Sequence, residues 1–427
     1  MWQRIRELAH LIAPAILLLA GALWVASMLV QPAPPTTITI ATGGTSGGYY
    51  AFGQRYAEIL AESGITLEVR PTAGSVENAA LLADASSGVS IALIQGGIAN
   101  AVDLPDAVSL GRVTLEPLWV FYRSNKYYDR LVQLRGKRLA VGKEGSGTRK
   151  LAETLLAANG AMEGTTLLPL GGEEASAALA NGEADAAFFV LSPDSRLVAD
   201  ALHNPSFRLM NFVQADAIAR LYPYLHKVVL PKGVVNLVNN VPTADVSLLA
   251  SSAALVARSD LHPALIGLLV EAAQQVHAGS TLIYGPGEFP QAIDPELPMS
   301  EDAARVYKSG QSFLKRVLPF WLATFVERML IIAVPVAAFA FPVFKLAPLL
   351  YEWHIKRRIY YWYEELKKLE GRVVEGGTQL DVPAMAREIQ RIDDAAAVIP
   401  VPLRYSENLF NLRMAISLVR QKIQNIA

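Results

Sequence analysis

The chain has 427 residues, with 38 basic and 39 acidic side chains, so its net charge of −1 provides no global field for nucleic acid. It has no cysteine, which excludes disulfides, thiolate metal sites and thiol nucleophiles. A hydrophobic fraction of 52% is high for a purely soluble protein, and membrane segments are the obvious cause.

The N-terminal region predicts a membrane anchor. After the short segment 1–7, residues 8–30 read LAHLIAPAILLLAGALWVASMLV, with no formal charge and enough length to cross a bilayer. The sequence that follows, QPAPPTT, lacks a small-residue cleavage signal, so we expect an uncleaved anchor rather than a removed signal peptide. The prolines then act as a spacer between the anchor and the rest of the chain.

Beyond the spacer, strand-like and helical patterns alternate in two units of one design. The first unit reads TITIAT, a GGTSGG loop, a helix to Glu62, TLEVRPTAG, SVENAALLADASSG and VSIALIQ. The second reads RLAVGK, an EGSGT loop, RKLAETLLAANG, TTLLPLGG, EEASAALANG and ADAAFFV. The helix stops correspond, Gly64 with Gly160 and Gly88 with Gly182. Such βαβαβ units predict an α/β fold with two parallel sheets, hence two lobes.

Two extended stretches lie outside this repeat. They are LEPLWVFYR, Leu115–Arg123, and DVSLLASSAALVAR, Asp245–Arg258. Either they cross between the lobes and form a hinge, or they are ordinary sheet strands. The helical PALIGLLVEAAQQVHAG that follows the second stretch is expected to return to the first lobe.

Four loops at strand ends predict a ligand site. They are Gly43–Gly48, Gly74–Val76, Gly145–Thr148 and Gly171–Glu173. In parallel α/β sheets, ligands bind beyond the carboxyl ends of strands, against helix N-termini that favour anions. Any one of these loops is more typical of an ordinary helix cap, but the repetition in both units favours a site between two facing lobes.

The candidate ligand-binding residues are Gly44, Thr45, Ser46, Tyr49, Ser75, Gln95, Ser146, Gly147, Thr148 and Phe189. Glycines let backbone N–H groups approach a ligand, and hydroxyls donate hydrogen bonds. Gln95 and Phe189 end the two buried strands, where a cleft floor would lie, and a buried glutamine needs a hydrogen-bond partner. Tyr49 either walls the cleft or simply packs.

Catalytic residues, cofactors and metal sites find no support. The six histidines are scattered without metal-ligand spacing, and H-E-x-x-H and a phosphate-cradling lysine are absent from the sequence. We therefore expect a binding protein rather than an enzyme, and a small carboxylate rather than a nucleotide phosphate as its ligand.

A second membrane segment is expected at residues 326–351. Its apolar run, Met329–Tyr351, contains three prolines and Lys345, which either snorkels to the headgroups or contacts a membrane partner. Lys356, Arg357 and Arg358 follow, so the positive-inside rule places both termini in the cytoplasm and the βαβαβ units outside. In a Gram-negative cell this means the inner membrane, with the binding domain in the periplasm.

The tail, residues 352–427, predicts a helical hairpin. Its stripes are Met385, Ile389, Ile392, Ala396 and Ile399, then Leu409, Leu412, Ile416, Val419 and Ile423. Spacings of three and four place each stripe on one helix face. The tail could pack locally, lie on the membrane surface, self-associate or bind a partner.

Five motifs resemble the TAXI receptors of tripartite ATP-independent periplasmic (TRAP) transporters. They are TGGTSGGYYAFG (42–53), TAGSVENAALL (72–82), IALIQ (91–95), GKEGSGT (142–148) and GEADAAFFV (182–190), and the resemblance covers residues 38–315. It implies a type II-like, two-lobed periplasmic binding protein, with lobe I at 36–118 and 243–316 and lobe II at 119–242. It also implies a glutamate-, glutamine- or dicarboxylate-like ligand, a TRAP permease as partner, and ligand roles for Thr45, Tyr49, Ser75, Gln95, Ser146 and Thr148.

The two expected membrane segments depart from this family, whose ordinary receptors are soluble or lipid-anchored. A receptor held in the bilayer at both ends cannot diffuse between permeases. Either a permease is held nearby, or the domain senses its ligand and reports occupancy to the cytoplasmic tail.

Overall fold

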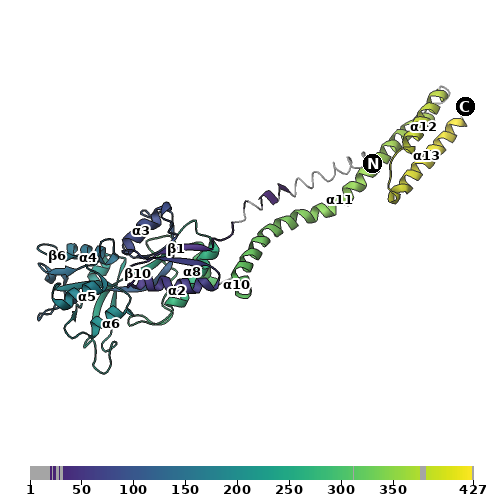
Figure 1. Cartoon of the computed structure of the whole chain (residues 1–427). Helices are drawn as coiled ribbons and strands as arrows, with labels where there is room; N and C mark the ends of the chain where they lie inside the picture. Colours follow the sequence, from purple (N-terminus) through teal and green to yellow (C-terminus); the bar gives the residue numbers. More distant parts are fainter. Residues whose placement is uncertain are drawn as a thin grey trace. The chain divides into compact units, whose positions relative to one another are not determined.

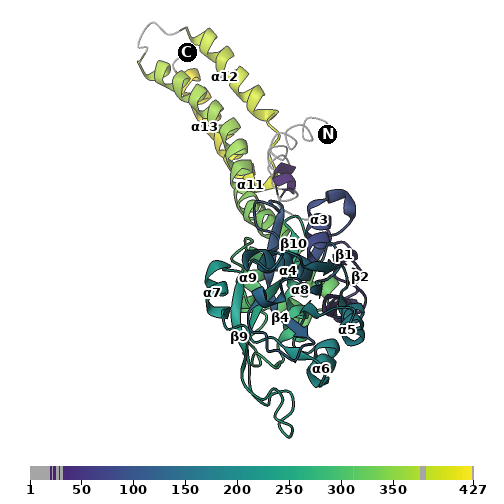
Figure 2. The same ribbon diagram turned by 90° about the vertical axis from the view of Figure 1, so that its left-hand side faces the viewer.

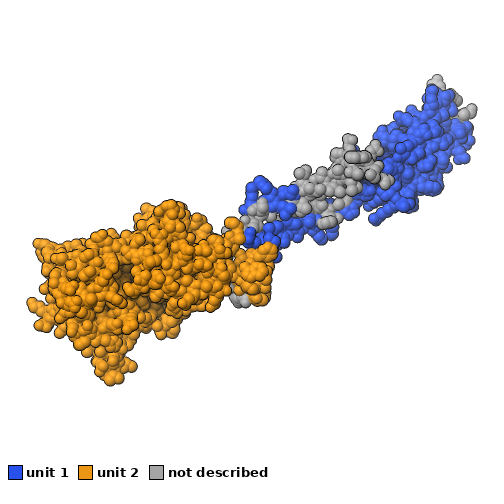
Figure 3. Space-filling view, in the orientation of Figure 1, with its two compact units in different colours: residues 1–31, 327–427 blue, residues 32–326 orange. Residues whose placement is uncertain are grey.

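The computed structural model describes residues 20, 21, 23–25, 28, 32–310, 312–375 and 381–425. The chain divides into two compact units (Figure 3). One consists of residues Pro32–Val326, and the other consists of Met1–Gln31 together with Glu327–Ala427. The anchor expected at residues 8–30 lies largely outside the described residues.

The Pro32–Val326 unit contains the two expected βαβαβ repeats. The first consists of β1 (Thr37–Ala41), α2 (Gly48–Glu62), β2 (Thr66–Arg70), α3 (Ser75–Ala83) and β3 (Ile91–Gln95). The second consists of β5 (Arg138–Ala140), α4 (Gly147–Ala158), β6 (Thr166–Leu168), α5 (Gly172–Asn181) and β7 (Ala186–Val190). β1 pairs in parallel with β2 and β3, and β5 pairs in parallel with β6 and β7. The predicted parallel repeat is therefore confirmed.

The corresponding glycine stops share one backbone conformation. Gly64 and Gly160 have φ angles of +76° and +65°, and Gly88 and Gly182 have +77° and +78°. This left-handed region ends helices readily when the residue has no Cβ atom. The equivalence seen in the sequence is thus a structural equivalence.

Two long strands join the repeats into one sheet. β4 (Ala107–Tyr122) and β10 (Val246–Arg258) lie at its centre, and the strand order is β2-β1-β3-β10-β4-β7-β5-β6. β3 pairs with one end of β10, while β7 pairs with the far end of β4. The expectation of two separate sheets is therefore wrong, because β4 begins at Ala107, eight residues before the expected Leu115, and is long enough to serve both halves.

Each half has its own apolar core. One core joins β1 and β3 to α2 and α8 (Pro263–His277), and the other joins β5 and β7 to α4 and α5. Figure 1 shows α2, α3 and α8 at one end of the unit and α4, α5 and α6 at the other. The remaining elements of this unit are η1 (Ala85–Ser87), η2 (Leu131–Leu134), α6 (Arg196–His203), β8 (Arg208–Leu209), α7 (Ala215–Leu221), β9 (Leu225–Leu230), α9 (Glu301–Ser309) and α10 (Phe313–Val317).

The tail forms a three-helix bundle. α11 (Phe320–Glu375) is followed by α12 (Val382–Ala397), η4 (Leu403–Tyr405) and α13 (Ser406–Gln424). Figures 1 and 2 both show α12 and α13 alongside the end of α11. The predicted stripe residues Ile389, Ile392, Ala396, Leu412, Ile416, Val419 and Ile423 are buried together with Ile359, Leu366, Leu369 and Val373 of α11. The predicted hairpin is therefore present, and the end of α11 packs against it as a third helix that was not predicted.

One helix in the described part of the chain is long and apolar enough to cross a membrane. The segment is Phe320–Pro342 of α11, with a mean hydropathy of 1.9. It begins six residues before the expected segment 326–351 and ends at Pro342, although α11 itself continues without interruption from Phe320 across all three prolines. Lys345 lies with Nζ 5.2 Å from the ring centroid of Phe341, so its own helix provides a cation–π contact.

Candidate ligand-binding site

The four predicted loops meet in two pairs. The carbonyl oxygen of Gly145 accepts hydrogen bonds from the N–H groups of Val76 and Glu77, at 3.2 and 3.3 Å. In the other pair, the Oγ atom of Ser46 lies 3.8 Å from the position that a Cβ of Gly172 would take. The repeats thus face each other loop to loop. However, the first-turn amides of α3 at Val76 and Glu77 bond to Gly145, so they are not available to an anion here.

A buried tyrosine and a buried glutamate form a polar pair behind the first loop, between α2 and β4. The hydroxyl of Tyr49, in the first turn of α2, donates a 2.6 Å hydrogen bond to Oε2 of Glu116 on β4. Burial raises the pKa of Glu116 to about 8, although the bond from Tyr49 acts in the opposite direction. Burial, and then the neighbouring Glu116, raise the pKa of Tyr49 well above its usual range. The raised pKa favours the protonated, neutral form of Glu116 at pH 7.

Gln95, at the end of β3 in the first repeat, contacts Gly147 at the start of α4 in the second repeat. Its backbone N–H donates to Oγ of Ser75 at 3.0 Å. Its side-chain oxygen Oε1 lies against Gly147, so closely that a Cβ at Gly147 would collide with it. Its Nε2 atom is buried and has no hydrogen-bond partner among the described residues. A buried amide with two unused donors suits an acceptor supplied by a ligand.

The central strands supply further buried polar groups. Ser251 of β10 stands opposite Glu116 in the strand register, and its Oγ atom also has no partner within the described ranges. Oγ1 of Thr114 lies 2.9 Å from the hydroxyl of Tyr284. From the sequence these stretches were expected to be either hinges or ordinary sheet strands, and Glu116, Ser251 and Thr114 were not among the predicted ligand residues. The available signal was a glutamate and serines inside otherwise apolar strand patterns.

Arg112 is a buried cation on the same strand as Glu116, but its charge is already balanced. Its Nη2 atom lies 2.8 Å from Oδ1 of Asp294 and 2.7 Å from Oε2 of Glu296. The guanidinium thus ties the 294–296 segment to the centre of the sheet. A ligand anion between the loops would be held by neutral donors rather than by this arginine.

Several predicted residues have structural partners. Ser146 caps α4, since its Oγ accepts from the N–H of Arg149 at 3.2 Å and donates to the carbonyl of Lys143 at 2.7 Å. Oγ1 of Thr148 accepts from the N–H of Val190 at 3.3 Å. Phe189 is buried in the core of the second repeat, with its ring centroid 6.2 Å from that of Phe121.

The residues of the GGTSGG loop lie in two different environments. Gly44 and Thr45 are exposed, and the carbonyl of Gly44 accepts from the N–H of Gly47 in a turn. Ser46 lines a groove of about 750 Å³ whose other walls come from α5 and α6. The structure therefore brings Tyr49, Ser75, Gln95 and Gly147 together and directs Ser46 elsewhere. Within the described ranges, no group of three or more histidine, aspartate or glutamate side chains is placed to hold a metal ion.

Comparison with known proteins gives one family match and several structural likenesses. A solved protein from Bordetella bronchiseptica RB50 is 13% identical, with a TM-score of 0.43, covering 65% of this chain and 99% of that one. The alkanesulfonate-binding protein SsuA from Xanthomonas axonopodis pv. citri, bound to MOPS, is 17% identical, with a TM-score of 0.37, covering 57% and 75%. An ancestral arginine-binding protein bound to arginine is 11% identical, with a TM-score of 0.37, covering 58% and 96%.

The family match spans both repeats. The model of the NMT1-like family matches residues 40–275, from β1 to the end of α8. This range is more than half of the 427 residues. The chain therefore belongs to the NMT1-like family, a periplasmic solute-binding type of protein.

Proposed function

We propose that the Pro32–Val326 unit is an extracytoplasmic receptor of the TAXI type that binds a small organic anion, glutamate- or dicarboxylate-like, for a TRAP secondary transporter. One observation carries this proposal: the buried Nε2 atom of Gln95, without a partner among the described residues, at the place where both repeats meet. The ligand carboxylate supplies the missing acceptor.

The donors around this place suit a carboxylate. Gln95 Nε2, Ser251 Oγ and the protonated carboxyl of Glu116 all donate hydrogen bonds, and none adds a charge that must be neutralised. Hydrogen bonds to a charged group contribute about 1.5–3 kcal/mol each, so a few of them fix an anion without an arginine. The five sequence motifs favour the TAXI type in particular.

Closure of the cleft is assigned to the two shared strands. In the proposal, lobe I (36–118 and 243–316) and lobe II (119–242) rotate about β4 and β10. The register of the pair shifts between Ala253 and Val256 of β10, opposite Ser109–Thr114 of β4, and a bulge of this kind lets a strand bend. In this proposal the hydrogen bonds from Val76 and Glu77 to Gly145 form when the two lobes close.

Isothermal titration of the full-length protein in detergent tests the proposal. Glutamate, glutamine, succinate and 2-oxoglutarate are titrated in turn, and about micromolar binding of at least one is expected, near −8 kcal/mol. Gln95→Leu should abolish it, whereas Gln54→Leu, at an exposed position of α2, should not. No heat with any small anion contradicts the proposal.

The second candidate function is ligand sensing or scaffolding through the tail. It is favoured by α11, which runs as one helix from Phe320 to Glu375 and so leads directly from the binding unit into the bundle. Because the chain has no cysteine, single cysteines at the exposed positions 403 and 418 report tail contacts between copies cleanly. Crosslinking in membranes should change when ligand is added, and an unchanged pattern contradicts signalling.

A further inference from the structure

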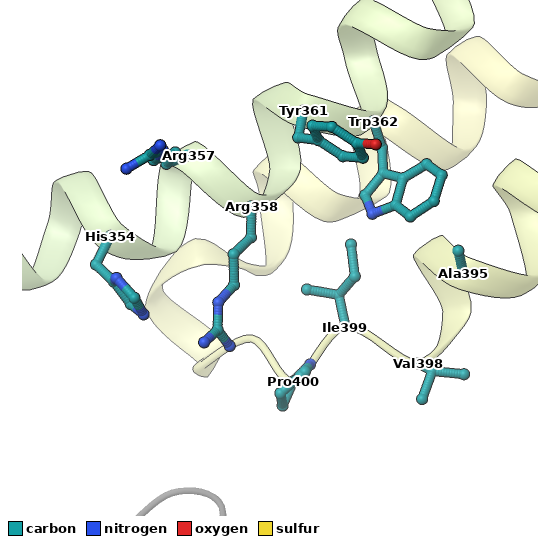
Figure 4. A pocket seen from close by; sticks show the side chains of 9 residues that line it. All are labelled: His354, Arg357, Arg358, Tyr361, Trp362, Ala395, Val398, Ile399 and Pro400. Atoms are coloured by element: carbon teal, nitrogen blue, oxygen red, sulfur yellow. The ribbon is translucent and has the colours of Figure 1, made fainter. Parts of the chain in front are cut away.

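A pocket lies within the bundle of the tail. It has a volume of about 570 Å³ and lies between α11 and the end of α12 (Figure 4). Its lining residues are His354, Arg357, Arg358, Tyr361, Trp362, Ala395, Val398, Ile399 and Pro400. Small-molecule sites in proteins have volumes of about 300–1,000 Å³, so the pocket is large enough for a ligand.

One face of α11 gives this pocket its charge. The α11 lining residues lie at spacings of three and four from His354 to Trp362, so they share a helix face. Two of the nine described lining residues are arginines, one is a histidine, and none is acidic. In Figure 4, His354 and Arg358 point to the same side, toward Pro400, and Trp362 lies above Ile399. Donors on one wall and apolar carbons on the other suit a ligand with an anionic and an apolar part.

His354 adds a donor that lacks an acceptor. Its Nε2 atom is buried and has no hydrogen-bond partner within the described part of the chain. Arg357, one turn on, lies with its guanidinium carbon 5.2 Å from the ring centroid of Trp353, which holds that side chain against the helix. An oxygen of a bound ligand would satisfy the imidazole on the side of α11 to which Arg358 also points (Figure 4).

The pocket lies where the apolar surface of α11 ends. Leu346, Leu349, Leu350 and Trp353 expose half or more of their side chains, and beyond them come Lys356, Arg357 and Arg358. This order, exposed apolar residues and then an indole and cations, is typical of a helix leaving the hydrocarbon core through the headgroup layer. Phosphate esters are concentrated in that layer.

We propose that the pocket of His354, Arg357 and Arg358 binds the phosphate group of an anionic phospholipid in the leaflet next to the tail. Arginine pairs with phosphate through two parallel hydrogen bonds, and basic pockets at the cytoplasmic border hold lipid headgroups. The acyl chains then lie along the exposed leucines of α11. A soluble phosphate would meet the same donors, but it has no acyl chains to cover Leu349 and Leu350.

Native mass spectrometry of the full-length protein in detergent tests the site. With phosphatidylglycerol, lipid adducts should persist at about tenfold lower lipid concentration than with phosphatidylcholine, and Arg358→Gln should remove about that difference. Arg357→Gln, at an exposed position, is the second variant and should act in the same direction without unfolding the bundle. Lys367→Gln removes the same charge from another exposed position of α11 and should change nothing.

Three outcomes overturn the proposal. Equal adducts with the two lipids would exclude headgroup selection. Competition by inorganic phosphate or glycerol 3-phosphate as strong as by phosphatidylglycerol would identify a soluble ligand instead. Arginine variants that change the melting temperature but not the adducts would show that these cations only cap the C-terminal end of α12. Gln95→Leu should leave the lipid adducts unchanged, so a negative result for the lipid site can be distinguished from a negative result for the proposed ligand-binding site.

Discussion

The hydroxyl of Tyr49 donates a 2.6 Å hydrogen bond to Oε2 of Glu116, and both residues are buried. The bond joins the first turn of α2 to β4, the strand that pairs with both halves of the sheet. Because burial raises the pKa of Glu116 to about 8, this carboxyl changes its charge in a pH range where binding can be measured.

Anion binding should weaken as the pH rises through about 8. Below that pH Glu116 is protonated and neutral, whereas above it the carboxylate repels a bound carboxylate. Glu116→Gln keeps the shape and the neutral charge, so it should bind as well as the unsubstituted protein at pH about 7 and better at pH about 9. Isothermal titration at both pH values measures the difference.

Glu58→Gln, at an exposed position of α2, controls for the loss of a carboxylate. Tyr49→Phe removes a bond that favours the ionised carboxylate, so it should move the weakening to higher pH. Affinity that rises with pH would contradict the prediction, because Glu116 would then be pairing with a cationic group of the ligand.

Gly147→Ala should weaken ligand binding without unfolding the protein. Gly147 is the first residue of α4, and alanine is a better helix former than glycine. The added Cβ would collide with Oε1 of Gln95, so Gln95 must leave its position or the two repeats must stay apart. We expect affinity to fall by about tenfold, since 1.4 kcal/mol in binding free energy corresponds to that factor.

Gly267→Ala is the matched control for this substitution. Gly267 lies in α8, and a Cβ there would have its nearest neighbours at 3.8 and 3.9 Å, which is ordinary contact. An unchanged dissociation constant in Gly147→Ala, with the melting temperature retained, would show that the approach of Gln95 to Gly147 has no part in binding.

Stability should fall in mild acid because of His277. Its Nε2 atom lies 2.6 Å from the hydroxyl of Tyr56, and burial lowers its pKa from 6.5 to about 3. Below pH 6.5 His277 is therefore protonated in the unfolded chain but stays neutral in the folded chain. The stability present above pH 6.5 should be lost toward pH 3, by up to about 1.4 kcal/mol for each pH unit.

Urea unfolding followed by tryptophan fluorescence, to which the buried Trp119 contributes, measures this loss. Between pH about 6.5 and about 5, where few other groups titrate, His277→Gln should show a smaller decrease than the unsubstituted protein. His203→Gln removes an exposed imidazole as a control. The same decrease in all three proteins would assign the acid sensitivity to other groups.

The repeat could be predicted from the sequence because it depends on local patterns. Gly64 and Gly160 end helices for the same steric reason, and the strand and helix periods need no tertiary information. Glu116 could not be predicted, because its importance comes from Tyr49, which is 67 positions away in the chain and meets it only when the sheet forms. Ser146 and Thr148 were predicted as ligand residues since caps and ligand sites use the same side chains, and only the structure shows Arg149 and Val190 as their partners.

The tail bundle gives the last prediction. Leu412 of α13 is fully buried among α11, α12 and α13, whereas Leu418 on the same helix exposes 56% of its surface. Leu412→Ala should destabilise the bundle by about 2–5 kcal/mol, because a buried leucine loses its transfer free energy and leaves a cavity. Leu418→Ala should stay within about 0.5 kcal/mol, as surface substitutions do.

Limited proteolysis of the full-length protein in detergent distinguishes the two variants. Leu412→Ala should make residues 381–425 sensitive at protease concentrations that leave Leu418→Ala intact, because opening of the bundle exposes the chain. Ligand binding to the Pro32–Val326 unit should persist in both variants, since none of the residues packed around Leu412 belongs to that unit. If Leu418→Ala were the more sensitive protein, its exposed face would instead be covered by another molecule in solution, and the three-helix bundle would not be the complete tail.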